Sequence, residues 1–139
     1  MGKELHRVVL RSVARLHHDD VIGRDAIFRK SITNNIRDGV TGCLAQPDGH
    51  FVQVIEGVKG QVDSLLDRIR ADDRHEQMTV LGRWTVSGRL FIGWAMARPD
   101  PTPMNDQAFR VCTRDGSGVQ VTTVLLGLMG PGDHLYAVT

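Results

Sequence analysis

The segment GQVDSLLDRIRAD, residues 60–72, places the strongest constraint on how this chain folds. Its apolar residues stand at the i, i+3, i+4 and i+7 positions of one helix face: Val62, Leu65, Leu66 and Ile69. A helix with one apolar stripe buries that stripe against another element. Because strand-like segments precede and follow this helix, we expect its stripe to lie on a β-sheet.

The rest of the chain up to residue 97 alternates between strand-like and helix-like patterns. Strands are predicted over residues 6–12, 40–45, 50–56, 78–86 and 90–96, and a further helix over 24–35. Pro47 and Gly49 suit a turn that joins the second strand to the third as a hairpin. The order β-α-β-β-α-β-β predicts a ferredoxin-like α+β fold, with a mixed five-stranded sheet and two helices on one face.

The C-terminal part of the chain is expected to form a separate extension. Residues 98–106 contain three prolines and are interpreted as a linker. Residues 105–114 look helical, whereas residues 119–129 are ambiguous, because their apolar spacing favours a helix and their β-branched content favours a strand. We choose helix. The expected division is a domain over 1–97 and an extension over 98–139 that packs on the domain or forms an oligomer contact.

Composition excludes several classes of protein. A chain of 139 residues with 17 basic and 16 acidic side chains has a net charge of +1, which gives no electrostatic case for binding nucleic acid or an anionic membrane. Cys43 and Cys112 lack any metal-type spacing, so they indicate a reducing compartment. The N-terminus has charges within its apolar run, and no apolar stretch approaches transmembrane length. A cytoplasmic location is therefore expected.

Catalytic and metal-binding motifs are absent from the sequence. There is no GxSxG, no Walker loop, no GxGxxG after a strand and no HExxH among the six histidines. No cysteine or serine has a base at a recognisable spacing. We therefore predict neither an enzyme nor a metal site.

Gln53 occupies a costly position on the third predicted strand. Period-two alternation places it on the same face as Phe51 and Ile55, which looks like the buried face. Burying a primary amide without partners costs on the order of 2 kcal/mol or more. The sequence leaves two partners open, a backbone group or a ligand.

Other polar residues stand where a core is expected. They are found on the two predicted helices: Ser31, Asn34, Asn35 and Arg68. Each has a purely structural interpretation as well, with Asn35 capping the helix end and Arg68 pairing with Asp72 at i+4. Together they look like the lining of a cleft between two helices and the sheet, which suits a flat heterocycle with carbonyls and ring nitrogens.

Four segments resemble, in order and spacing, the signature segments of the BLUF family, the sensors of blue light using FAD. They are NNIRDGVTGCL (34–44), FVQVIEG (51–57), DRIRADDRH (67–75) and RLFIGWAM (89–96). The resemblance runs from about Leu5 to Ala97. It implies a flavin ring between the two helices, with FAD as the cofactor.

The resemblance also implies a set of cofactor-binding residues. Ile27 and Ile69 match the aliphatic positions that flank the ring, Asn34 and Asn35 would bond its carbonyl and imide edge, and Arg68 would face the second carbonyl or the phosphates. The complete set is Ile27, Ser31, Asn34, Asn35, Gln53, Arg68, Ile69, Asp72 and His75.

Gln53 matches the switching glutamine of the family. By resemblance it would bridge the N5 and O4 edge of the flavin to a tyrosine on the first strand, with Trp94 and Met96 beside it. The first strand of the family typically reads R-L-I-Y-x-S, whereas this chain has RVVLRS, with Leu10 in place of the tyrosine. Leu10 has neither a redox-accessible electron nor a proton to give, so we expect an altered or absent photocycle.

Three interpretations remain open from the sequence. In the first, the protein binds flavin but is photochemically silent or altered, with Trp94 as a conceivable substitute electron donor. In the second, it is a flavin-free interaction module with the BLUF fold, and in the third it is another kind of flavoenzyme. Besides FAD, the expected partners are a second copy of the chain and an unidentified downstream protein, with no nucleic acid and no membrane.

Overall fold

The computed structural model describes residues 4–15, 21–45, 50–91 and 117–127. Its elements in chain order are β1 (Leu5–Ala14), α1 (Val21–Asp38), β2 (Thr41–Ala45), β3 (His50–Val58), α2 (Lys59–Ala71), β4 (His75–Val86) and α4 (Gly118–Gly127). The predicted order is confirmed through β4, and the helix predicted over 119–129 is confirmed as α4. The helix predicted over 105–114 lies outside the described residues.

The described strands form one four-stranded sheet in the order β2-β3-β1-β4. Every pairing in it is antiparallel, so the prediction of a mixed five-stranded sheet is wrong for this part of the chain. The reason is topological, because β3 lies between β1 and β2 and β1 lies between β3 and β4, so parallel strands are never neighbours. Of the predicted fifth strand, Leu90 and Phe91 lie in an irregular segment, and residues 92–96 lie outside the described ranges.

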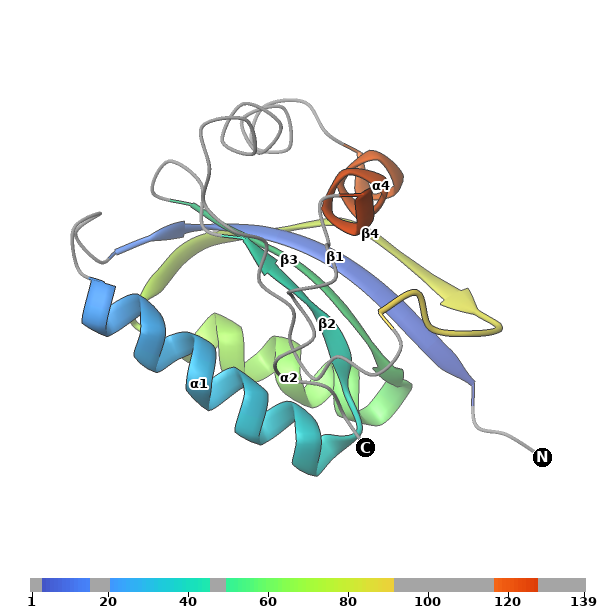
Figure 1. The fold of residues 1–139 in the computed structure, drawn as a ribbon, viewed down its shortest axis with the longest axis horizontal. Coiled ribbons are helices and arrows are strands. Elements are labelled where there is room, and N and C mark those ends of the chain that lie inside the picture. The colour runs from blue at the N-terminus through green and yellow to red at the C-terminus, as the bar shows by residue number, and fades with distance from the viewer. Residues whose placement is uncertain (1–3, 16–20, 46–49, 92–116, 128–139) are drawn as a thin grey trace.

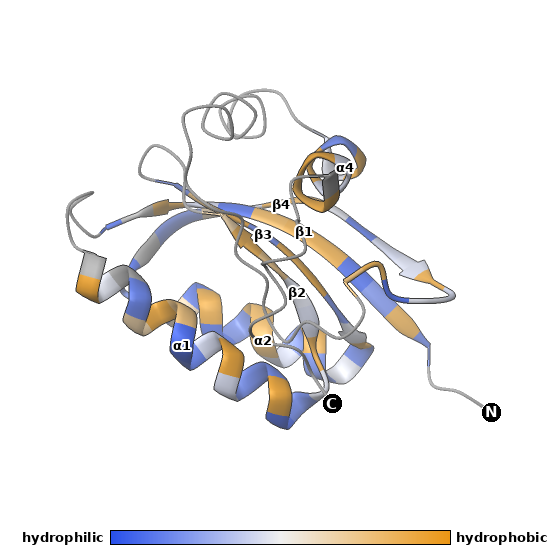
Figure 2. Ribbon diagram, in the orientation of Figure 1, coloured by the Kyte–Doolittle hydropathy of each residue, from blue (hydrophilic) through white to orange (hydrophobic). Residues whose placement is uncertain are grey.

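The elements form three layers, with α1 and α2 on one face of the sheet and α4 on the other (Figure 1). Because side chains alternate along β3, this strand places apolar residues on both faces of the sheet. Phe51 and Ile55 face α1 and α2, as predicted, whereas Val52 and Val54 belong to the cluster beneath α4. Because the sheet is covered on both sides, hydrophobic residues run along the middle of β1 (Figure 2).

The apolar stripe of α2 packs on the sheet as its spacing predicts. Val62, Leu66 and Ile69 are buried in a cluster with Leu10 of β1 and Ile55 of β3. Burying such side chains contributes roughly 1.5–3 kcal/mol each. This packing fixes α2 against the central strands and leaves its neighbouring face for the site.

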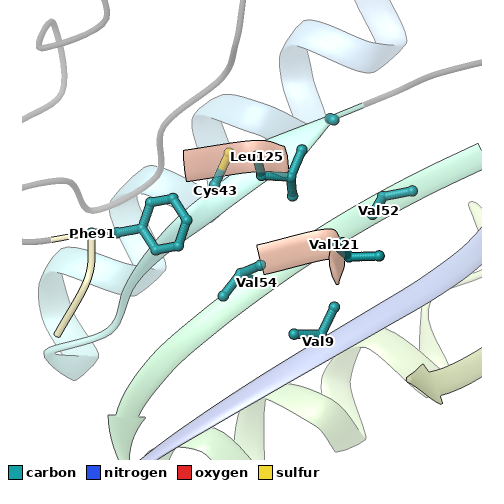
Figure 3. Close-up of a cluster of buried hydrophobic side chains, with 8 residues drawn as sticks. Val9, Cys43, Val52, Val54, Phe91, Val121 and Leu125 are labelled. Atoms are coloured by element: carbon teal, nitrogen blue, oxygen red, sulfur yellow. The ribbon is translucent and has the colours of Figure 1, made fainter. Parts of the chain in front are cut away.

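The opposite face of the sheet packs against α4. Val121 and Leu125 of α4 meet Val9, Val54 and Phe91 there (Figure 3). The beginning of α4 lies against β4 at two glycines: a Cβ atom on Gly82 would stand 2.6 Å from Cζ3 of Trp84 and 3.3 Å from the Cα atom of Gly118. The close approach therefore requires the absence of a side chain at this point.

Replacing Gly82 by alanine should destabilise the protein by roughly 1–3 kcal/mol, because the added methyl group overlaps the Trp84 ring and the α4 backbone. Urea unfolding measures the effect. Gly60→Ala is the matched control, since nothing lies within 4 Å of a Cβ atom there and alanine favours the helix. Equal unfolding free energies for the two variants would contradict this account of α4 docking.

Candidate functional site

A pocket of about 360 Å³ lies between α1, α2 and the face of the sheet that these helices cover. It gathers eight of the nine predicted cofactor-binding residues: Ile27, Ser31, Asn34, Asn35, Gln53, Arg68, Ile69 and Asp72. The ninth, His75, begins β4, and its side chain lies outside the described part of the chain. Residues from α1, α2 and the sheet thus meet around one cavity. Their role in binding a cofactor stays a prediction.

The two helices supply aliphatic walls. Ile27 of α1 is 5% exposed and packs with Phe28, Leu44 and Phe51, while Ile69 of α2 is 8% exposed and packs in the cluster that contains Leu10. Both isoleucines line the pocket. These walls favour a ligand with apolar faces.

Gln53 brings an unpaired amide to the sheet side of the pocket. In the register its neighbours are Leu10 on β1 and Leu44 on β2, neither of which has a hydrogen-bonding side chain. Its side chain is almost fully buried, and no hydrogen bond joins the amide to another residue in the described part of the chain. The backbone partner that the sequence left open is therefore not seen there. A ligand with a polar edge would satisfy the amide.

Arg68 brings a second unsatisfied donor. Its Nη2 atom donates to Oδ2 of Asp38 at 2.8 Å, which joins α2 to the end of α1. Its Nε atom is buried without a partner among the described residues. Asp72, the partner expected at i+4, instead accepts hydrogen bonds from the Arg74 side chain, among them one from Nε at 2.9 Å and one from Nη2 at 2.7 Å, and from the Arg74 backbone N–H at 2.9 Å. A buried donor without a partner is costly, and the acceptor of a bound ligand would remove that cost.

Asp38 is the anion that holds Arg68 in place. Hydrogen bonds from Arg37, at 2.8 and 3.0 Å, are the main cause that lowers the pKa of Asp38 to about 2, and the hydrogen bond from Arg68 lowers it further against the effect of burial. Asp38 is therefore ionised at neutral pH. The two helices that form the pocket are tied together by this charge.

Acidification should remove this tie. The native pKa of Asp38 is lowered, so its contribution to stability is complete above the ordinary value of 3.8 and is lost as the pH falls toward about 2. Asp38→Asn should lower the unfolding free energy on the order of 1 kcal/mol at about pH 7, and this difference should shrink as the pH falls from the ordinary value of 3.8 through about 2. Urea unfolding across this range measures it.

Asp67→Asn is the control for this titration, because the Asp67 side chain is 79% exposed and its partner Arg70 lies at 3.6 Å. A constant difference between wild type and Asp38→Asn from about pH 5 to pH 2 would refute the role of Asp38.

Sequence reasoning missed five lining residues: Lys30, Leu44, Leu65, Ala71 and Arg74. Leu44 could have been predicted as a lining residue, because the predicted hairpin places it across from Gln53. Lys30 lies one helical turn from both Ile27 and Asn34, so its place on the pocket face of α1 could also have been predicted. Arg74 follows the end of α2, where no periodic pattern extends.

Leu10 lies directly opposite Gln53 and is completely buried. It packs with Ile55 and Ile69 and is not itself among the residues that line the pocket. Trp94 and Met96, which were predicted beside Gln53, lie outside the described residues.

Comparisons with known proteins agree with this geometry. The model of the BLUF family, described as sensors of blue-light using FAD, matches residues 5–97. The chain therefore belongs to the BLUF family, whose members are flavin-based blue-light sensor domains.

Curated relatives include two photoreceptor subunits from Euglena gracilis. Photoactivated adenylate cyclase subunit beta is 38% identical over 68 residues, which cover 49% of this chain and 8% of the relative. Subunit alpha is 40% identical over 62 residues, which cover 45% of this chain and 6% of the relative. The matched segments thus span less than a tenth of these relatives.

Solved structures match over nearly the full chain. BlrB, a BLUF protein in its dark state, is 31% identical with a TM-score of 0.78, over 92% of this chain and 96% of that chain. The photo-activated state of BlsA shares the fold at 21% identity, with a TM-score of 0.76 over 89% of this chain and 94% of that one.

The residues of the pocket fit the cofactor that defines the family. An isoalloxazine ring is flat and apolar on both faces and has carbonyls and nitrogens at its edge. The two isoleucine walls suit the faces, while the unpaired Gln53 amide and the orphaned Nε atom of Arg68 suit the edge. The described ranges contain no group of three His, Cys, Asp or Glu residues that could hold a metal ion. None of the helices they include is long and apolar enough to cross a membrane.

Proposed function

We propose that this chain holds FAD between α1 and α2 and that its photocycle is altered or absent. The observation that carries the proposal is the register of β1 and β3, which sets a fully buried leucine opposite Gln53. When bound, FAD supplies a ring that absorbs blue light and accepts electrons and protons. A light response also requires neighbouring side chains that can donate an electron and a proton to the ring.

Four residues are proposed to orient the ring. Ile27 and Ile69 restrict it between the helices, Gln53 hydrogen-bonds its polar edge from the sheet, and Arg68 donates from Nε to an acceptor on the ring. Asp38 keeps Arg68 in position while leaving Nε for the ligand. This support is consistent with a half-buried arginine whose Nε atom is buried and without a partner among the described residues.

Leu10 separates binding from photochemistry. The leucine fills its place in the cluster with Ile55 and Ile69, so no cavity or unpaired polar group is created. It cannot supply an electron or a proton to a light-excited partner, and Leu44 on the other side of Gln53 cannot either. Gln53 therefore has no redox-active neighbour in the register of the described sheet.

Protein purified with added FAD should retain visible flavin absorption bands after desalting. Arg68→Leu should weaken FAD binding by roughly tenfold or more, because a charge-assisted hydrogen bond is lost. Titration of flavin fluorescence measures the affinity.

Arg70→Leu is the matched control on the same helix, since Arg70 is 56% exposed and does not line the pocket. A colourless desalted protein would overturn the proposed binding and favour a flavin-free interaction module instead.

Restoring the phenol with Leu10→Tyr should produce a reversible, light-induced shift of the flavin spectrum that the wild type lacks. The larger side chain should also cost roughly 1–3 kcal/mol of stability, since Leu10 is fully buried. Illuminated absorption spectra measure the shift.

Leu10→Phe controls for size without the hydroxyl group and should remain silent. If flavin binds to Leu10→Tyr and no shift appears, the explanation that rests on the missing phenol is wrong.

We further propose that this domain is a non-enzymatic sensor located in the cytoplasm, which signals through a second copy of the chain or a downstream protein. Some BLUF relatives are named as photoactivated adenylate cyclases, but the present match covers only a small part of those proteins. The division at residue 97, with an extension over 98–139 that packs on the domain or forms an oligomer contact, belongs to the same proposal. It is supported by α4, which packs on the face of the sheet opposite the pocket.

A further inference from the structure

Residues 87–91 are bound to one end of the sheet on the side that carries α4. In the register Arg7 of β1, Glu56 of β3 and Thr41 of β2 stand side by side. Arg7 donates from Nη2 to the carbonyl of Gly88 at 3.3 Å, and Arg89 donates from Nη1 to Oγ1 of Thr41 at 2.9 Å. The segment after β4 is thus held to three adjacent strands, and we call it the crossing segment.

Glu56 is the centre of these contacts. Its Oε2 atom accepts from Nε of Arg7 at 2.9 Å and from the backbone N–H of Leu90 at 2.8 Å. Its Oε1 atom accepts from Oγ1 of Thr41 at 3.1 Å and from the backbone N–H of Phe91 at 3.0 Å. The side chain is completely buried. A carboxylate is retained in such a place only when it is fully hydrogen-bonded, as this one is.

The two backbone N–H groups connect Glu56 to α4. Leu90 and Phe91 are not part of a described strand, so the carboxylate takes the place of a strand partner for their N–H groups. The Phe91 side chain is fully buried and lies with Val121 and Leu125 of α4 (Figure 3). The position of Phe91 under α4 therefore depends on Glu56.

Glu56 also lies close to the pocket along the chain. It is three residues after Gln53 on β3, so the two side chains point to opposite faces of one strand. β3 is hydrogen-bonded to β1 and β2 along this stretch. A displacement of β3 at Gln53 is therefore carried to the carboxylate by a short piece of paired backbone.

We propose that Glu56 is a positioning residue that clamps the crossing segment to the sheet, seats Phe91 beneath α4 and links the pocket strand to α4. The evidence for the clamp is the set of hydrogen bonds within this chain, and it does not depend on flavin binding. The link to the pocket rests on the proposed flavin binding.

Amide hydrogen exchange on the full chain tests the clamp without flavin. In the wild type the Leu90 and Phe91 amides should be protected by roughly a hundredfold or more over an unstructured chain. Glu56→Gln should speed their exchange and that of α4 by roughly tenfold or more, because the new NH₂ group faces donors and Arg7 loses its charge partner. Glu76→Gln, at an exposed position on β4, should change nothing. Unprotected Leu90 and Phe91 amides in the wild type would overturn the clamp.

A milder variant decides the question if Glu56→Gln does not fold. Thr41→Val keeps the shape of the side chain and removes one donor to Oε1 and one acceptor of Arg89. Exchange at Phe91 should then rise roughly threefold or more, whereas Thr85→Val at an exposed site should leave it unchanged. Unchanged exchange at Phe91 in Thr41→Val would overturn the clamp.

The link to the pocket is tested by repeating the exchange measurement with FAD. Loading should change exchange at Leu90, Phe91 and α4 by roughly twofold or more, and this response should be lost in a Glu56→Gln protein that still shows flavin bands. Bound flavin without any change at Leu90 and Phe91 would overturn the link while leaving the proposed function intact. Protein that binds no flavin would overturn the proposed function and the link together, whereas the protection of the two amides would still decide the clamp.

Discussion

The pairing of β1 with β3 is the constraint on which the rest of this structure depends. One register sets Leu10 opposite Gln53 and Arg7 opposite Glu56. Because side chains alternate along a strand, a slip of one residue would turn Gln53 away from the pocket and turn Glu56 toward the face that α1 and α2 cover. The apolar clusters on both faces of the sheet forbid that slip, so the packing of the core and the arrangement of the polar groups are fixed together.

The parts of the fold that local periodicity encodes were predictable. These parts are the apolar stripe of α2, the alternation of β3 and the hairpin before β3, which all depend on residues close together in sequence. They were enough to predict which face of the sheet the helices cover and that Gln53 lies on that face. The strand directions were mispredicted because they depend on which strands become neighbours. The contact of Arg68 with Asp38 was also missed, since it joins residues 30 positions apart on two helices. The burial of Glu56 and its hydrogen bonds could not be predicted from the sequence, because a glutamate beside a glycine at a strand end is normally exposed to solvent.

The acidic side chains at the pocket are paired within the protein. Asp38 holds Arg37 and Arg68, and Asp72 holds Arg74, so each acidic residue is already engaged by arginine. Among the described residues, the pocket still presents the Lys30 side chain without an ion pair, the Gln53 amide and one N–H of Arg68. Under the proposed function, the amide and the N–H would hydrogen-bond the edge of a polar ring, and the apolar walls would contact its faces.

Under the proposed function, Leu10 would allow flavin binding and light response to be separated in this fold. The pocket is lined by other residues, and Leu10 lies behind them in the cluster that supports Ile69. A side chain with a hydroxyl group at position 10 would change the shape of the pocket little. It would, however, be the only hydrogen-bond donor that β1 places opposite Gln53. Its absence leaves the walls and the edge contacts in place and removes the proton and the electron. Under the proposed function, a change at one buried position would abolish a photochemical step without dismantling the pocket.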